Sequence, residues 1–142
     1  MTKNKKVIKS FGEEWKKFDQ SKLDKLELKK IFKDYFRIFP WKLINKKSIG
    51  FDMGCGSGRW AKVVAPRVGM LNCIEPSLAI DVARKNLSQN KNVNFIKLAI
   101  EDINLKPGSQ DFGYCLGVLH HTDNTQKNLN KCTSLLKKNA PF

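Results

Sequence analysis

The sequence has little arginine, few acidic residues and no long apolar run. Only four of its 27 basic residues are Arg: Arg37, Arg59, Arg67 and Arg84. No stretch approaches the roughly 20 apolar residues that a membrane span needs. The Lys-rich start has no apolar segment behind it, so no secretory signal is indicated and the cytoplasm is the default location. A length of 142 residues suits one folded core.

The formal net charge of +14 raises the question of an anionic partner. Proteins that read nucleic acids rely on Arg, because its guanidinium forms paired hydrogen bonds with bases and phosphates. Here nearly all the positive charge is Lys. A solvated lysine surface is therefore favoured, and nucleic acid stays open as a partner without being favoured.

Four cysteines occur, and none of them forms a C-x-x-C pair. No His lies at zinc-ligand spacing from any of them. A free Cys packs like a small apolar residue. We therefore predict four free thiols, most of them buried, and no metal site.

Helical and strand patterns divide the chain near residue 45. Apolar and aromatic residues recur at helical spacing before it, which predicts two amphipathic helices over 11–18 and 21–39, the second stopped by Pro40. Strands then alternate with helices, which predicts parallel βαβ units. We expect a helical extension over 1–45 and an α/β domain over 46–142. The predicted strands are 48–53, 70–75, 93–98 and 111–116, and the predicted helices are 59–68, 78–87 and 124–138.

The most informative segment reads Asp52-Met53-Gly54-Cys55-Gly56-Ser57-Gly58-Arg59. It follows a predicted strand and opens a helix, a context in which a glycine pattern indicates a nucleoside-binding loop. Glycines let the backbone turn sharply and approach a ligand closely. The first N–H groups of the helix add positive potential.

Three cofactors compete for this loop. ATP is disfavoured, because a P-loop needs a Lys after its last glycine. A dinucleotide loop needs G-x-G-x-x-G, but Arg59 stands where the third glycine would be. An acid at Asp52 would repel a pyrophosphate and attract a cation, and S-adenosylmethionine (SAM) carries an ammonium and a sulfonium. Glu75, 21 residues after Gly54, is placed to accept both ribose hydroxyls.

The glycine loop resembles the first motif of class I SAM-dependent methyltransferases. The segment Gly117-Val118-Leu119-His120-His121-Thr122-Asp123 resembles the G-V-L-H-H-T segment of the branch that includes the quinone-biosynthesis methyltransferases. The resemblance implies a Rossmann-like α/β sandwich preceded by N-terminal helices. It also implies SAM-dependent methyl transfer to a small or lipid-like acceptor.

The resemblance also implies roles for individual residues. Asp52 and the Leu116 carbonyl would hold the methionine ammonium, and Glu75 the ribose hydroxyls. One loop departs from the pattern: Ala99 stands where relatives often carry an Asp that reaches the adenine. Adenine recognition would then depend on backbone groups there or on the neighbouring acids. The full predicted cofactor set is Asp52, Gly54, Cys55, Gly56, Gly58, Glu75, Pro76, Ser77, Glu101, Asp102 and Leu116.

His120 and His121 are the two histidines and follow the fourth predicted strand. Either could act as a general base near neutral pH. Adjacent side chains usually point apart, so we expect only one of them to face the site. A metal site is not expected, because adjacent histidines cannot easily share one ion.

The family fold has seven strands in the order 3-2-1-4-5-7-6, and this sequence supplies four. We therefore expect a C-terminally truncated chain that could itself be inactive. The last strand would be a bare sheet edge that promotes self-association. Two other functions stay open: an NAD(P)-binding Rossmann enzyme, and a catalytically silent or RNA-associated methyltransferase-like module.

Overall fold

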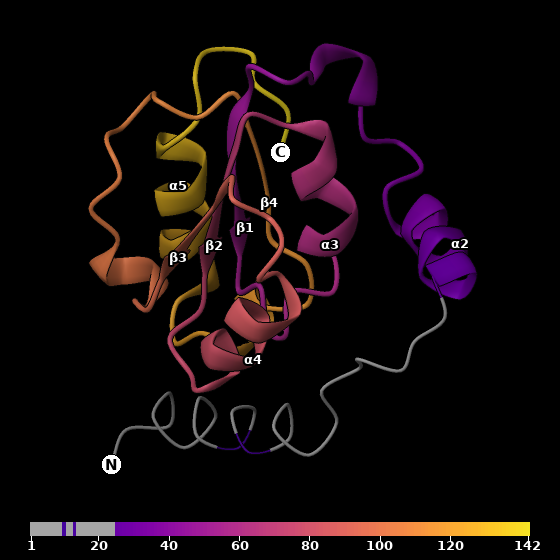
Figure 1. Ribbon diagram of the computed structural model, residues 1–142. Coiled ribbons are helices and arrows are strands. Elements are labelled where there is room, and N and C mark those ends of the chain that lie inside the picture. The colour runs from indigo at the N-terminus through magenta and orange to yellow at the C-terminus, as the bar shows by residue number, and fades with distance from the viewer. Residues whose placement is uncertain (1–9, 11–12, 14–24) are drawn as a thin grey trace.

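The computed structural model describes Ser10, Glu13 and residues 25–142, and in this part of the chain the fold is a single parallel sheet between helices. The strand order is β3-β2-β1-β4, as the family resemblance implies. Figure 1 shows the sheet with α5 on one side and α3 on the other. The strands are β1 (Ile49–Met53), β2 (Met70–Ile74), β3 (Val93–Ile96) and β4 (Phe112–Tyr114), and the helices are α2 (Lys25–Tyr35), α3 (Ala61–Val64), α4 (Ala79–Asn86) and α5 (Thr125–Ser134).

Each predicted strand forms, and the differences lie in the helices. The helix predicted over 59–68 is a short α3 that continues as a 3-10 turn at Ala65–Arg67, because Pro66 cannot donate to the α-helical ladder. Asn124 caps α5, its side chain accepting from the Lys127 N–H at 2.8 Å. That helix ends at Ser134, four residues earlier than predicted, and Lys137 instead pairs with Asp111.

The predicted N-terminal helices are described only in part. The helix predicted over 11–18 lies outside the described residues, apart from Glu13. The second predicted helix is present as α2 but ends at Tyr35, so the chain leaves it before Pro40. None of the described helices is long and apolar enough to cross a membrane.

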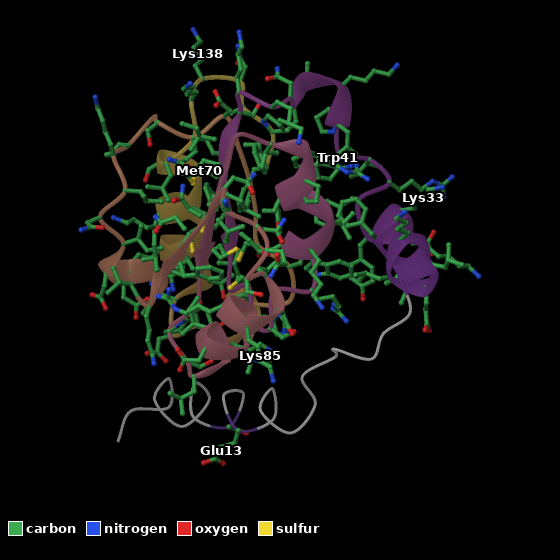
Figure 2. All side chains as sticks on the ribbon, in the orientation of Figure 1. Glu13, Lys33, Trp41, Met70, Lys85 and Lys138 are labelled. Carbon is green, nitrogen blue, oxygen red and sulfur yellow. The ribbon has the colours of Figure 1, made fainter. Side chains whose placement is uncertain are left out.

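One face of the sheet is covered by α3, α4 and the aromatic stripe of α2. Phe32 and Phe36 of this stripe are buried, with ring centroids 4.4 Å apart. They contact Trp60 and Trp41, and Phe36 also meets Tyr114 of β4 at 5.1 Å. Figure 2 shows Trp41 beside α3, on the side toward α2. Aromatic contacts therefore join the N-terminal helix to the strand that borders the sheet.

A second apolar cluster lies on the opposite face, beneath α5. It includes Phe51, Met53 and Ile74 from the sheet, with Cys132 and Leu135 from the helix side.

All four cysteines are free, and three are buried, as predicted. The Cys73 thiol and burial hold the pKa of Cys55 well above its ordinary value of 9.0. The thiol of Cys55 is therefore protonated and unreactive at neutral pH.

Glycine faces phenylalanine twice where β1 meets β4. The register pairs Gly50 with Phe112 and Phe51 with Gly113. A Cβ on Gly50 would lie 2.3 Å from the Phe112 ring, and one on Gly113 would lie 2.2 Å from the Phe51 ring. Each ring therefore fills the space that the opposing glycine leaves, and this packing sets the spacing of β1 and β4.

The outer edge of β4 is not as bare as the sequence led us to expect. The Gly113 N–H, which points away from β1, donates to the Pro141 carbonyl at 3.1 Å. The Phe142 ring follows and lies 6.2 Å from the Phe51 ring. One backbone N–H on this edge is therefore already hydrogen-bonded within the chain. The predicted self-association through the edge stays a prediction.

Replacing Gly113 by Ala should destabilise the protein by about 1–3 kcal/mol, because the new methyl group overpacks against Phe51. Urea unfolding would measure the loss. In a Phe51→Leu background the same substitution should cost clearly less, since the opposing ring is gone. An equal cost in both backgrounds would show that the ring contact is not the cause.

Candidate cofactor site

A pocket opens where the parallel strands end, at the edge where ligands of open α/β sheets bind. Its walls come from the glycine loop after β1, the end of β2, the loop after β3 and the loop after β4. Four separate segments of the chain therefore converge on one space. The lining residues are 54–57, 59–60, 74–76, 98–101, 116–118 and 121–122.

The glycine loop is held close to its neighbours in conformations that favour glycine. Gly54 has a φ of +77°, and a Cβ there would lie 2.3 Å from a Val118 methyl group. Gly58 has a φ of +80°, and a Cβ there would lie 2.8 Å from Leu87 of α4. A side chain at Gly54 would push apart the loops after β1 and β4, and one at Gly58 would displace α4.

Glu75 fixes the glycine loop to the end of β2. One carboxylate oxygen accepts the Gly56 N–H at 3.2 Å, and the other accepts the Ser77 N–H at 2.9 Å. A carboxylate oxygen has two lone pairs, so each keeps capacity for one further donor. Glu75 also lines the pocket. The carboxylate therefore stands on the pocket wall in a fixed orientation.

Asp52 lies behind the pocket wall instead of on it. The residue is 2% exposed and pairs across the sheet with Tyr114. Burial raises the pKa of Asp52 to about 7; the Tyr114 hydroxyl lowers it and the Glu75 charge raises it further. Within the described residues neither Asp52 Oδ2 nor the Tyr114 hydroxyl has a hydrogen-bond partner. An unsatisfied carboxylate oxygen is thus buried at the end of β1, the strand that leads into the glycine loop.

The loop after β4 brings Leu116, Val118 and His121 to the pocket. His120 is not on the pocket wall. The two imidazole rings do not point apart, as we had expected, but lie against each other with centroids 3.8 Å apart. Both histidines belong to the 3-10 turn Leu119–His121.

The remaining predicted cofactor residues divide between the wall and its support. Pro76 and Glu101 line the pocket, whereas Asp102 does not. Gly58 and Ser77 lie outside the wall as well; the Ser77 hydroxyl accepts the Ala79 N–H at the start of α4. Ala99, the position that departs from the family pattern, lines the pocket beside Glu101.

The sequence analysis missed several lining residues, and two of them have large side chains. Arg59 and Trp60 follow the glycine loop and reach the pocket, and the Arg59 guanidinium lies over the Trp60 ring at 4.2 Å. One sequence signal could have identified Arg59 as a lining residue. It has the first long side chain after the last glycine of the loop. Nothing in the sequence shows that Trp60 is held by α2.

Acidic residues gather at the pocket end of the molecule. Between residues 40 and 142 there are seven, and all except Asp111 lie at or beyond the carboxyl ends of strands. Figure 2 shows Lys138 at the opposite end of the molecule. The six acids at the pocket end are Asp52, Glu75, Asp81, Glu101, Asp102 and Asp123.

The family model described as "Methyltransferase domain" matches residues 51–142, which is more than half of the chain. The chain belongs to the methyltransferase domain family. This confirms the class I SAM-dependent methyltransferase assignment made from the two motifs, and SAM is the cofactor of that class. The quinone-biosynthesis branch is not distinguished from other branches. No curated protein sequence matches the chain.

Solved structures of methyltransferases share this fold at low sequence identity. The YcgJ protein from Bacillus subtilis is 20% identical with a TM-score of 0.64 over 78% of this chain and 45% of its own. Phosphoethanolamine N-methyltransferase 1 from Haemonchus contortus, solved with phosphoethanolamine and S-adenosylhomocysteine, is 16% identical with a TM-score of 0.72, over 96% of this chain and 31% of its own.

A third structure is the Haloferax volcanii complex between the Trm112 methyltransferase activator and a methyltransferase. It is 16% identical with a TM-score of 0.74 over 92% of this chain and 56% of its own. The chain thus spans about half, or less, of the length of these proteins. The likeness confirms the Rossmann-like methyltransferase fold that the family resemblance implied.

Replacing Asp52 by Asn should stabilise the protein above neutral pH. The folded chain holds the Asp52 proton more tightly than the unfolded chain does, since burial raises its pKa from 3.8 to about 7. The stability that Asp52 contributes is therefore complete below pH ~4 and is lost as the pH rises through ~7. Asn carries no charge, so the variant should exceed the wild type by up to about 4 kcal/mol at pH 8 and match it near pH 3.5.

Denaturant unfolding across pH 3.5–8 would measure this difference. Asp111→Asn is the matched control, because burial raises the Asp111 pKa but hydrogen bonds from Lys137 and the Ile49 N–H outweigh it and hold that pKa low. Asp111→Asn should be less stable than the wild type at neutral pH. This difference in stability should shrink as the pH falls through the native pKa of Asp111. A pH-independent difference for Asp52→Asn would refute the buried, protonated carboxyl.

Proposed function

We propose that this chain binds SAM in the pocket and that the protein transfers its methyl group to a small or lipid-like acceptor. The observation that carries the proposal is Glu75, whose carboxylate is fixed at the pocket wall with a free lone pair on each oxygen. Two vicinal ribose hydroxyls are the donors that such a carboxylate suits. The family match supports the methyl transfer.

The other residues of the pocket fit the rest of SAM. The buried, unpartnered Oδ2 of Asp52 supports a role as acceptor for the methionine ammonium, directly or through water, and the Leu116 carbonyl would share that role. Gly54, Cys55 and Gly56 line the pocket and would lie along the methionine and ribose. Pro76 and the backbone of Ile100 and Glu101 would enclose the adenine, with Ser77 and Asp102 behind them.

Bound SAM supplies an electrophilic methyl group on a positively charged sulfur. The protein then contributes mainly by positioning, which can supply about 7–11 kcal/mol of the barrier reduction. His121 reaches the pocket, so it is the better placed of the two histidines to accept a proton from an acceptor. His120, whose ring lies against it, would hold that ring in place.

The acceptor class rests on the apolar part of the pocket wall. Trp60, Leu116 and Val118 line it beside the glycine loop, and such side chains suit a small organic or lipid-like molecule. The names of the structural neighbours cover several acceptors: one acts on phosphoethanolamine and another on tRNA. We favour the small acceptor, because a lysine-rich surface with few Arg side chains is poorly suited to reading RNA.

Titration calorimetry with S-adenosylhomocysteine (SAH) and with NADH tests the cofactor. SAH should bind and NADH should not. Glu75→Gln should weaken SAH binding by roughly 10- to 100-fold, because hydrogen bonds to a charged group contribute about 1.5–3 kcal/mol. The matched control is Asp81→Asn, an acid at the same end of the molecule that does not line the pocket.

Two outcomes would contradict the proposal. Binding of NADH without SAH would favour a dinucleotide enzyme. Salt-sensitive binding of RNA that persists when SAH binding is abolished would favour the RNA-associated module. Equal effects of Glu75→Gln and Asp81→Asn would remove Glu75 from the ribose site.

A further inference from the structure

We infer that Arg59 binds the α-carboxylate of the cofactor's methionine moiety. The inference rests on the proposed SAM site and adds to it a residue that recognises the amino acid end of the ligand. Two residues that flank the glycine loop would then bind the amino acid group of the cofactor: Asp52 its ammonium and Arg59 its carboxylate.

Among the described residues that line the pocket, Arg59 is the only Lys or Arg. The acids on this wall are Glu75 and Glu101. The part of the chain that the structure describes contains two salt bridges, Lys97 with Asp81 and Lys137 with Asp111. Neither involves Arg59, so its guanidinium reaches the pocket without a carboxylate partner among these residues.

Aromatic rings hold the guanidinium where it is. It lies 4.2 Å from the centroid of the Trp60 ring, and the Tyr35 ring lies 5.0 Å from that same ring. Trp60 is 6% exposed and packs against Phe32 and Phe36, so it is a rigid support. Stacking on an aromatic face leaves the in-plane N–H donors of Arg available for paired hydrogen bonds with a carboxylate.

The environment of the guanidinium favours an anion. Desolvation lowers the pKa of Arg59 below its ordinary value, and the nearby Tyr35 partly opposes this. Such a partly buried cation, with no counter-ion among the described residues, gains from a negatively charged partner. An anion entering the pocket would supply that partner.

The position of Arg59 relative to Asp52 identifies the anion. The ammonium and the carboxylate of an amino acid are attached to the same carbon atom, so their partners must lie close together. Asp52 and Arg59 flank the same glycine turn in the sequence; Asp52 is buried, and Arg59 lines the pocket. The acids assigned to the ribose and adenine, Glu75 and Glu101, come from the ends of β2 and β3.

The test compares two ligands that differ in the amino acid part. SAH carries the carboxylate, whereas 5′-methylthioadenosine keeps the adenosine and a thioether and lacks the amino acid. Arg59→Gln should weaken SAH binding by about 10- to 100-fold, since it removes a charged, paired hydrogen bond. It should change the affinity for 5′-methylthioadenosine by less than about twofold. Calorimetry at constant salt would measure both.

Arg67→Gln is the matched control. Arg67 also packs over aromatic rings, at 5.1 Å from both Phe32 and Trp41, but it does not line the pocket. It should leave both affinities unchanged. Arg59→Lys keeps the charge and loses the paired geometry, so it should weaken SAH binding by less than Arg59→Gln does, and it serves if the Gln variant fails to fold.

The outcomes separate this inference from the proposed function. Failure of the wild-type chain to bind SAH would overturn the proposed function, and the role of Arg59 with it. Wild-type SAH binding that survives Arg59→Gln would overturn the role of Arg59 alone. Equal losses for SAH and 5′-methylthioadenosine would also overturn it, because they would show that Arg59 only shapes the pocket.

Discussion

The backbone turn between β1 and α3 is the constraint on which the rest of the site depends. Gly54 and Gly58 both adopt positive φ angles, and each leaves room for a neighbour: Val118 from the loop after β4, and Leu87 from α4. The turn therefore determines how closely these two segments approach the sheet. Hydrogen bonds from the Gly54 and Cys55 N–H groups to the Ile74 carbonyl then fix it to β2.

Two acids near this turn, Glu75 and Asp52, differ in burial and in hydrogen bonding. Glu75 accepts two backbone N–H groups at the pocket wall, so its orientation is fixed before any ligand arrives. Asp52 is enclosed beside Tyr114 with an unsatisfied oxygen, so its charged form is disfavoured until a cation reaches it. The first acid is ready to recognise hydroxyl groups, and the second becomes charged most easily in the presence of a positive ligand.

Local patterns predicted the strands and the glycine loop, because both depend on residues close together in the chain. The run from Ile49 to Met53 and the spacing of Gly54, Gly56 and Gly58 needed no knowledge of distant contacts. The burial of Asp52, the position of Arg59 and the contact between the His120 and His121 rings could not be predicted in that way. Each depends on how Tyr114, α2 or a 3-10 turn packs in three dimensions, and one sequence carries no local sign of such packing.

The acids on the pocket wall have a consequence for cofactor exchange. SAM carries one net positive charge, whereas SAH, which remains after the methyl group leaves, is neutral overall. Glu75 and Glu101 line the pocket, so in the proposed site they would hold SAM more firmly than SAH. Fresh cofactor would then replace spent cofactor more easily than the reverse.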